Sequence, residues 1–176
     1  GIDHETFIPG KKSSDPLVLY VGRLQSYKSL HIFLESAKAV LSEVPEAKFI
    51  IAGNGEERRK LQQLVKKLDL HESVQFTGYI TEEEKVALFQ QAWVFVNPSV
   101  REGWGITTLE ANACGTPVVA SRVSGLKDAV VDQETGFLVP YGDIQAFTKK
   151  IVTLLTDAEK RESFSRAAIL WARQYN

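Results

Sequence analysis

The sequence predicts an α/β fold, a Rossmann-like parallel sheet of about six strands with helices on both faces. Short apolar runs rich in β-branched and aromatic residues recur along the chain, and stretches with helical periodicity separate them. Such alternation forms right-handed βαβ units, which make the strands parallel and place helices on both faces. The six strands are expected at 17–21, 49–52, 74–76, 94–96, 118–120 and 137–139.

Apolar residues spaced three and four positions apart, together with capping signals, mark the expected helices. The first such stripe runs from Leu30 to Val44 and stops before Pro45, which cannot continue a helix. Thr81 followed by Glu84 is a capping box that predicts a helix start. The other helices are expected over 61–68, 105–113, 125–131 (a short one), from about 143, and over 157–174.

Length and composition predict one ordinary globular domain over residues 1–176. The chain is 44% hydrophobic and 24% charged, and a chain of this size buries about 70% of its unfolded surface. Its 21 basic and 22 acidic residues give a net charge of −1, so no overall basic field points to nucleic acid. No apolar run approaches the roughly 20 residues that a membrane-spanning helix needs.

The cysteine and histidine content predicts a reducing compartment and no metal site. Cys114 is the single cysteine, which cannot form an intrachain disulfide, and it is interpreted as a core thiol. His4, His31 and His71 lie far apart in the sequence and are expected on the surface. The N-terminal residues lack the pattern of a secretory signal, so we expect a cytoplasmic protein.

Ligands of such sheets bind beyond the carboxyl ends of the strands, so the residues that follow each strand are the candidates for function. Gly22, Arg23 and Lys28 follow the first strand, and a guanidinium with an ammonium matches a diphosphate. The alternative is a solvated arginine and an ordinary surface lysine. After the second strand, Gly53-Asn54-Gly55 lacks the third glycine of a dinucleotide fingerprint, which argues against a nicotinamide enzyme.

The segment after the fourth strand carries the most information. Gly103 and Gly105 flank Trp104 just before a predicted helix. The free N–H groups and the positive dipole end at the start of that helix predict an anion-binding site. Glu102 and Glu110 lie up to about 12 Å apart along a helix axis, a separation that can straddle a diphosphate. The alternatives are a capping role for Glu102 and an exposed position for Glu110. The apolar neighbours of Glu110 instead predict a buried carboxylate that needs partners.

These residues resemble a known family. Glu102-Gly-Trp-Gly-Ile-Thr-Thr-Leu-Glu110-Ala, followed by Ala113-Cys-Gly-Thr-Pro-Val-Val-Ala120, is similar to the paired-glutamate motif of group 1 retaining glycosyltransferases with the GT-B fold. Further segments resemble the family and occur in the same order along the chain. They are residues 22–24 together with Lys28, and the segments 53–55, 76–80 and 135–139. The resemblance covers nearly the whole chain but only half of the usual family protein. It implies a C-terminal, nucleotide-sugar donor-binding domain whose N-terminal acceptor domain is absent from residues 1–176.

The resemblance also implies roles for individual residues. Arg23 and Lys28, in the turn that begins at Gly22, would bind the donor's diphosphate, and Glu102 would contact hydroxyls of the transferred sugar. Glu110 would bind the ribose. Backbone amides would hold the sugar and phosphates, and the base would lie against a second segment, with Glu82 as a further contact. The amides belong to Gly103, Trp104, Gly105, Ile106 and Thr107, and the base segment is Tyr79 and Ile80.

The implied reaction transfers a hexose from a UDP- or GDP-sugar to a hydroxyl of a sugar or lipid-linked acceptor, with retention and without a metal cofactor. The isolated chain is expected to be inactive, because the acceptor and any peripheral membrane contact would belong to the missing half. A non-catalytic nucleotide-sugar sensor and half of a sugar-nucleotide epimerase remain as alternatives. Two departures from the family pattern are Ser29 in place of glycine and the segment 124–128 in place of Gly-Gly-x-x-Glu.

Overall fold

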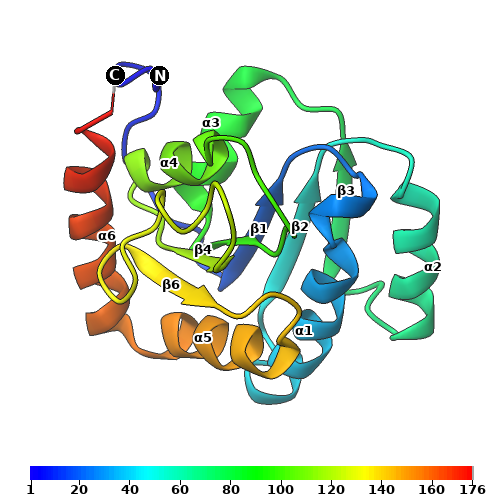
Figure 1. Ribbon diagram of the computed structural model, residues 1–176. Coiled ribbons are helices and arrows are strands. Elements are labelled where there is room, and N and C mark those ends of the chain that lie inside the picture. Colours follow the sequence, from blue (N-terminus) through cyan, green and yellow to red (C-terminus); the bar gives the residue numbers. More distant parts are fainter. Residues whose placement is uncertain (176) are drawn as a thin grey trace.

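In the computed structural model, which describes residues 1–175, strands and helices alternate along the chain as predicted (Figure 1). Every predicted strand is present, each within two residues of its expected ends. The elements are β1 (Leu17–Val21), the 3-10 helix η1 (Ser26–Lys28), α1 (Leu30–Glu43), β2 (Lys48–Ala52), α2 (Arg58–Lys67), β3 (Val74–Gly78), α3 (Glu82–Gln91), β4 (Val94–Asn97), α4 (Ile106–Ala113), β5 (Val118–Ser121), β6 (Gly136–Val139), α5 (Ile144–Thr156) and α6 (Ala158–Ala172).

The six strands pair in parallel in the order β3-β2-β1-β4-β5-β6. The chain builds one half of the sheet outward from β1 to β3 and then returns to place β4 on the other side of β1. The loops that follow β1 and β4 therefore diverge at the centre of the sheet, where doubly wound folds bind their ligands. The predicted Rossmann-like architecture is confirmed.

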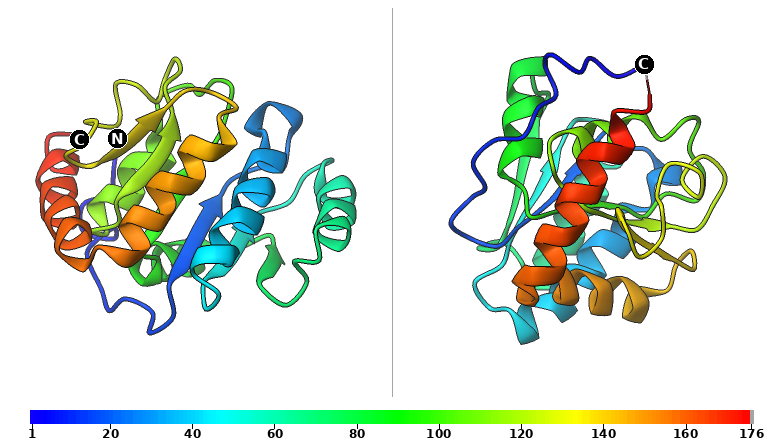
Figure 2. Two further views of the ribbon diagram at one scale, coloured as in Figure 1. Left: turned by 90° about the horizontal axis from the view of Figure 1, so that it is seen from below. Right: turned by 90° about the vertical axis from the view of Figure 1, so that its left-hand side faces the viewer.

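Two layers of helices enclose the sheet, as the side views show (Figure 2). Helices α1, α2 and α5 pack on one face, where Phe33 of α1 meets Phe49 of β2 edge-on at 6.0 Å between ring centroids. Helices α3 and α4 cover the other face, where Phe89 of α3 meets Phe95 of β4 at 5.5 Å. Helix α6 contributes buried side chains to both layers and so closes the β6 edge. Strands buried on both faces explain their continuous apolar sequences.

The two ends of the described chain meet beside α6 (Figure 1). The His4 side chain hydrogen bonds through Nε2 to the carbonyl oxygen of Tyr175. His4 is thereby partly buried, although the sequence predicted a surface histidine, whereas His31 and His71 are exposed as expected. This contact ties the N-terminal segment to the C-terminal helix.

The prediction of a short helix over 125–131 is wrong, because this segment forms consecutive turns. The amides of Leu126 and Lys127 both donate to the Val123 carbonyl oxygen. The amides of Ala129 and Val130 both donate to the Leu126 carbonyl oxygen. Gly125 takes a φ of 86°, which lies outside the helical region. A continuous helical ladder is therefore replaced by a compact turn that packs against the loop after β4.

Ser29 occupies a backbone conformation that glycine adopts more readily. Lys28 ends η1, and Ser29 links η1 to α1 with a φ of 54°. Left-handed backbone costs a non-glycine residue about 1 kcal/mol. The buried Ser29 hydroxyl lies 2.7 Å from the Tyr141 hydroxyl, a hydrogen bond that offsets this cost and that glycine could not make.

Two substitutions at Ser29 separate the strain from the hydrogen bond. Ser29→Ala loses the bond to Tyr141 and keeps the left-handed strain, so we expect it to lower the free energy of unfolding by about 1 kcal/mol. Ser29→Gly loses the same bond but relieves about 1 kcal/mol of strain, so it should lie close to wild type. Urea unfolding of the three proteins measures the difference. A glycine variant no more stable than the alanine variant would contradict this assignment.

Candidate functional site

An ion pair joins the loops after β1 and β4 at the centre of the sheet. Lys28 Nζ lies 2.7 Å from Glu102 Oε2 and 3.0 Å from Oε1. The two side chains are only 13% and 10% exposed, so the pair is largely withdrawn from water. A pair of this kind is sensitive to the loss of either partner, since the remaining charge would be buried alone. The structure thus brings together two of the predicted site residues and rules out a capping role for Glu102.

Buried polar side chains at the end of β4 orient this carboxylate, and the sequence analysis did not assign them. Asn97 is 1% exposed and donates from Nδ2 to Glu102 Oε1 at 3.0 Å. The side-chain oxygen of Asn97, Oδ1, accepts a hydrogen bond from the Ser99 hydroxyl at 2.7 Å. The signal for Asn97 was present, because a polar residue directly ends a buried apolar strand. Its contact with Glu102 depends on the fold of the intervening loop.

The turns over 123–130 support the same loop from outside. The Glu102 amide donates to the Ser124 carbonyl oxygen at 3.1 Å. A Cβ added to Gly125 would lie 2.1 Å from the Glu102 carbonyl oxygen, so no larger residue fits there. The segment over 123–130 therefore supports the Glu102 loop through its backbone, and Gly125 is the position where residue type matters.

The N-terminus of α4 presents unpaired amides beside this ion pair, as the motif predicted. Gly105 is the N-cap with a φ of 65°, and no side chain caps the helix. The first amides of a helix have no partner within it, and the helix dipole adds positive potential. Trp104 is 85% exposed and Ile106 is 38% exposed, which leaves apolar surface next to the amides.

The loop after β1 carries Arg23 on a rigid backbone. The Tyr20 hydroxyl donates to the Arg23 carbonyl oxygen at 3.0 Å, and a Cβ at Gly22 would lie 2.6 Å from that hydroxyl. The side chain of Arg23 is exposed and makes no ion pair among residues 1–175. A Cβ at Gly55 would lie 2.4 Å from the Leu24 carbonyl oxygen, so Gly55 permits the close approach of these two loops.

Glu110 belongs to a second charged cluster, separate from the Lys28–Glu102 pair. It is 7% exposed, and Lys85 Nζ lies 3.3 Å from its Oε1 and 3.2 Å from Glu82 Oε2. Burial raises the pKa of Glu110 above its ordinary value of 4.5, and the Lys85 charge opposes that rise. The predicted buried carboxylate is confirmed, and Lys85 is the partner that the sequence analysis missed.

The candidate base-binding segment lies at the end of β3, at the same edge of the sheet. Tyr79 is 81% exposed, and Ile80 is half-buried against the helix layer that contains α3. Glu82, in the first turn of α3, is connected to Glu110 through Lys85. The predicted positions therefore share one edge, while their roles toward a ligand stay predictions.

Other features of the described chain carry little chemistry. Within residues 1–175 no three His, Cys, Asp or Glu side chains are grouped so as to hold a metal ion. The expectation that no metal is needed stays a prediction.

Cys114 is buried as predicted, and burial raises its pKa to about 12, which suits a core thiol rather than a nucleophile. No helix described here has the length and apolar character that crossing a membrane requires.

This chain belongs to the group 1 glycosyl transferases, whose family model matches residues 2–171. It is 33% identical to the D-inositol 3-phosphate glycosyltransferase of Corynebacterium urealyticum, an alignment that covers the whole chain and 46% of the relative. The chain spans between 34% and 46% of the length of the first curated relatives.

Solved structures show that the fold is one half of the GT-B architecture. The C-terminal domain of LpcC, a group 1 glycosyl transferase of Francisella tularensis, superimposes with a TM-score of 0.89 at 23% identity and covers 99% of this chain and 97% of its own. Anabaena HepE, solved with UDP-glucose, gives a TM-score of 0.90 at 24% identity over 99% of this chain and 51% of its own.

Two glycines with left-handed backbone test the support of the Glu102 loop. Gly142→Ala at a φ of 78° has nothing within 4 Å of the added Cβ, so we expect only a strain cost of about 1 kcal/mol. Gly125→Ala meets the Glu102 carbonyl oxygen and should cost several-fold more, of order 3 kcal/mol. Urea unfolding of both variants provides the comparison. Equal losses would show that Gly125 does not hold the loop.

The buried carboxylate of Glu110 predicts a pH-dependent stability. Because its pKa is raised in the folded state, the folded protein keeps a proton that the unfolded chain releases, and stability falls as the pH rises above 4.5. Glu110→Gln removes this titration, so its free energy of unfolding relative to wild type should rise between about pH 4 and pH 7. The exposed Glu134→Gln is the control and should show no such rise. Parallel pH curves for wild type and Glu110→Gln would refute the assignment.

Proposed function

We propose that this chain is the C-terminal, donor-binding domain of a retaining glycosyltransferase, which transfers a hexose from a nucleoside diphosphate sugar to an acceptor hydroxyl. The Lys28–Glu102 pair beside the N-terminus of α4 is the observation that carries the proposal. It places a cation, a carboxylate and free amides at one point of the sheet edge. A diphosphate needs the cation and amides, and sugar hydroxyls are natural donors to the carboxylate.

Stabilisation of the leaving group is the central step of the proposed mechanism. As the bond between sugar and diphosphate breaks, negative charge grows on the diphosphate. Arg23, Lys28 and the amides at the start of α4 would neutralise that charge, and preorganised groups of this kind supply the largest single contribution in many enzymes. Glu102, held by Asn97, would orient the sugar, while the departing phosphate takes the acceptor's proton on the same face, as the resemblance implies.

In this proposal the two charged clusters contact opposite ends of the donor. Glu110 stands in the interior of α4, and its partner Lys85 belongs to α3. Among the described residues, the buried Oε1 of Glu110 accepts no hydrogen bond, and a ribose hydroxyl would donate one to it alongside the charge of Lys85. The base would then lie over Tyr79 and Ile80. Because HepE was solved in complex with UDP-glucose, UDP-hexoses are the first donors to test.

Calorimetric titration of this chain with UDP, GDP and ADP tests donor binding. We expect one nucleotide to bind selectively and Arg23→Ala and Glu110→Ala to weaken its binding at least about tenfold, since each removes a charged contact. Lys149→Ala on the exposed surface of α5 removes a charge elsewhere and should bind like wild type. Binding that all three variants retain would show that the donor site lies elsewhere.

Turnover is tested in the full-length protein that contains this domain. Glu102→Gln and Lys28→Ala should each lower kcat by about 100-fold or more, because each removes an electrostatic contact to the donor in the transition state. The anomeric configuration of the product, followed by NMR, tests retention. Nucleotide binding without any transfer would identify a sensor, and interconversion of the donor without an acceptor would identify an epimerase. Unchanged turnover in both variants would reject the residue roles.

A further inference from the structure

A hollow with two cationic side chains in its lining lies at the opposite edge of the sheet from the Lys28–Glu102 pair. It has a volume of about 220 Å³. Trp93 directly precedes β4 and Pro117 directly precedes β5, so the hollow opens at the amino ends of the strands. Its lining residues are Lys12, Trp93, Gly115, Pro117, Arg161, Glu162 and Ser165. The proposed donor site uses none of these residues.

Two cations line this hollow, and neither has a carboxylate partner. Lys12 Nζ donates to the Thr116 hydroxyl at 2.7 Å, and Arg161 Nη1 donates to the Leu154 carbonyl oxygen at 2.8 Å. The Arg161 guanidinium also stacks 4.2 Å from the centre of the Trp93 ring. Among residues 1–175, no Asp or Glu oxygen lies within 4.0 Å of either cation. These bonds leave further N–H groups on both side chains.

The energetics of these cations favour an anionic ligand. Burial lowers the pKa of Lys12 to about 8, and the nearby Arg161 charge lowers it further in the same direction. Burial likewise lowers the pKa of Arg161, while the negative charges of Glu162 and Asp157, which lie beyond ion-pair distance, oppose that shift. Like charges that share a partly buried hollow repel each other, and a bound anion would relieve both the repulsion and the loss of solvation.

We propose that this hollow binds a small metabolite through an oxyanion, a phosphate or a carboxylate group. Lys12 and Arg161 would donate to the oxyanion, and Arg161 is suited to two parallel bonds. Trp93 and Pro117 would contact the apolar part of the ligand. Such a ligand would bind independently of the donor, because its site lies at the other edge of the sheet.

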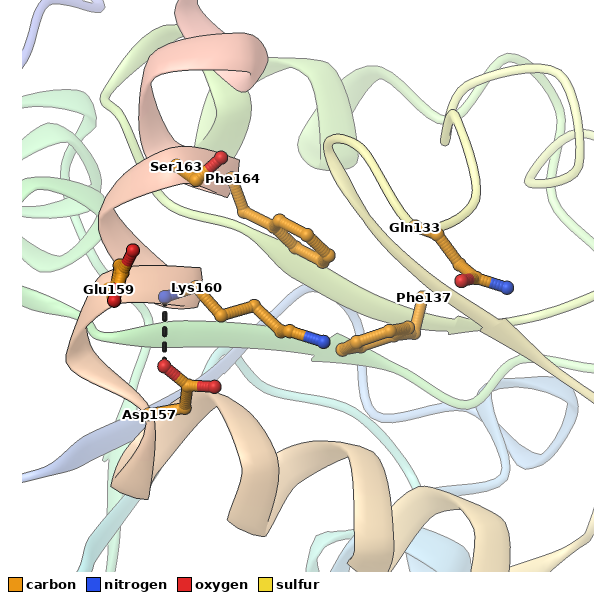
Figure 3. A pocket seen from close by; sticks show the side chains of 7 residues that line it. All are labelled: Gln133, Phe137, Asp157, Glu159, Lys160, Ser163 and Phe164. Carbon is orange, nitrogen blue, oxygen red and sulfur yellow. Dashed lines mark hydrogen bonds between the residues drawn. The ribbon is translucent and has the colours of Figure 1, made fainter.

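A neighbouring hollow on another side of α6 provides a matched comparison (Figure 3). It also contains a lysine, Lys160, whose ammonium lies 5.9 Å from the centre of the Phe137 ring. Two acidic residues, Asp157 and Glu159, line that hollow with it. These two carboxylates weaken the attraction of that hollow for an anion, whereas Glu162 is the one acidic residue that lines the hollow with Lys12 and Arg161. Lys160 therefore serves as a control lysine in the first turn of the same helix.

The groups that face Lys12 define a pH dependence. Arg161 stays charged, the Cys114 thiol with a pKa of about 12 is neutral, and the carboxylate of Glu162 is exposed. Lys12 in the free protein loses its proton as the pH rises through about 8. Oxyanion binding should therefore weaken above that pH, beyond any change in the ligand's own charge.

Titration of this chain with inorganic phosphate and with citrate, at constant ionic strength set by sodium chloride, tests the site. Calorimetry gives the affinity, and tryptophan fluorescence reports contact near Trp93. Lys12→Gln and Arg161→Gln should weaken binding at least about tenfold, whereas Glu162→Gln, which removes a nearby negative charge, should tighten it. Lys160→Gln should leave it unchanged. The two probes distinguish a phosphate-selective from a carboxylate-selective site, and either result supports the proposal.

Several outcomes would overturn the proposal. The first is that neither phosphate nor citrate binds at tens of millimolar. The second is that Lys160→Gln weakens anion binding as much as Lys12→Gln does. The third is that Glu162→Gln does not increase the affinity for the anion. Arg161 also bonds the end of α5, so its variant could unfold, which circular dichroism would reveal. Lys12→Gln and Glu162→Gln keep the test valid in that case. In titrations with UDP on the same proteins, Arg23→Ala reports on the proposed donor site and Lys12→Gln reports on this hollow, so a failure of one proposal is distinguished from a failure of the other.

Discussion

The pairing of β1 with β4 is the constraint on which the site depends. Only two residue pairs, Val18 with Val94 and Leu19 with Phe95, record this pairing, yet it joins the two halves of the sheet. It brings the loops that follow these strands side by side although 74 residues separate Lys28 from Glu102. The ion pair between them could not form in another strand order. The reversal of strand order at this point opens the crevice in which such folds bind ligands.

Around this junction the chain balances buried charge with polar partners. Glu102 accepts from Lys28 and Asn97, and Glu110 is paired with Lys85, so each carboxylate has a fixed direction. The amides at the start of α4 have no such partner within the helix. The edge is therefore preorganised for a ligand that brings both negative charge and hydroxyl donors. A nucleoside diphosphate sugar has both.

The sequence predicted the strands and the principal site positions because these follow from local patterns. Apolar runs mark strands buried on both faces, and the glycines around Trp104 mark the turn before α4. The partners of these residues were harder to predict from the sequence. Lys85 reaches Glu110 only when α3 and α4 pack together, and Ser29 forms a hydrogen bond with Tyr141 in a loop far along the chain. The turns at Gly125 were mistaken for a helix, because its close approach to Glu102 is set by tertiary packing.

We propose that the donor binds at one edge of the sheet, around Lys28, Glu102 and the start of α4. Chemical-shift mapping of the ¹⁵N-labelled chain with UDP-glucose and its GDP and ADP counterparts tests this proposal most directly. We expect the largest amide shifts at Gly103 to Thr107 and around Arg23, with little change at Gly115 or Ser165 on the opposite side. Shifts confined to other surfaces while a nucleotide sugar binds would contradict it.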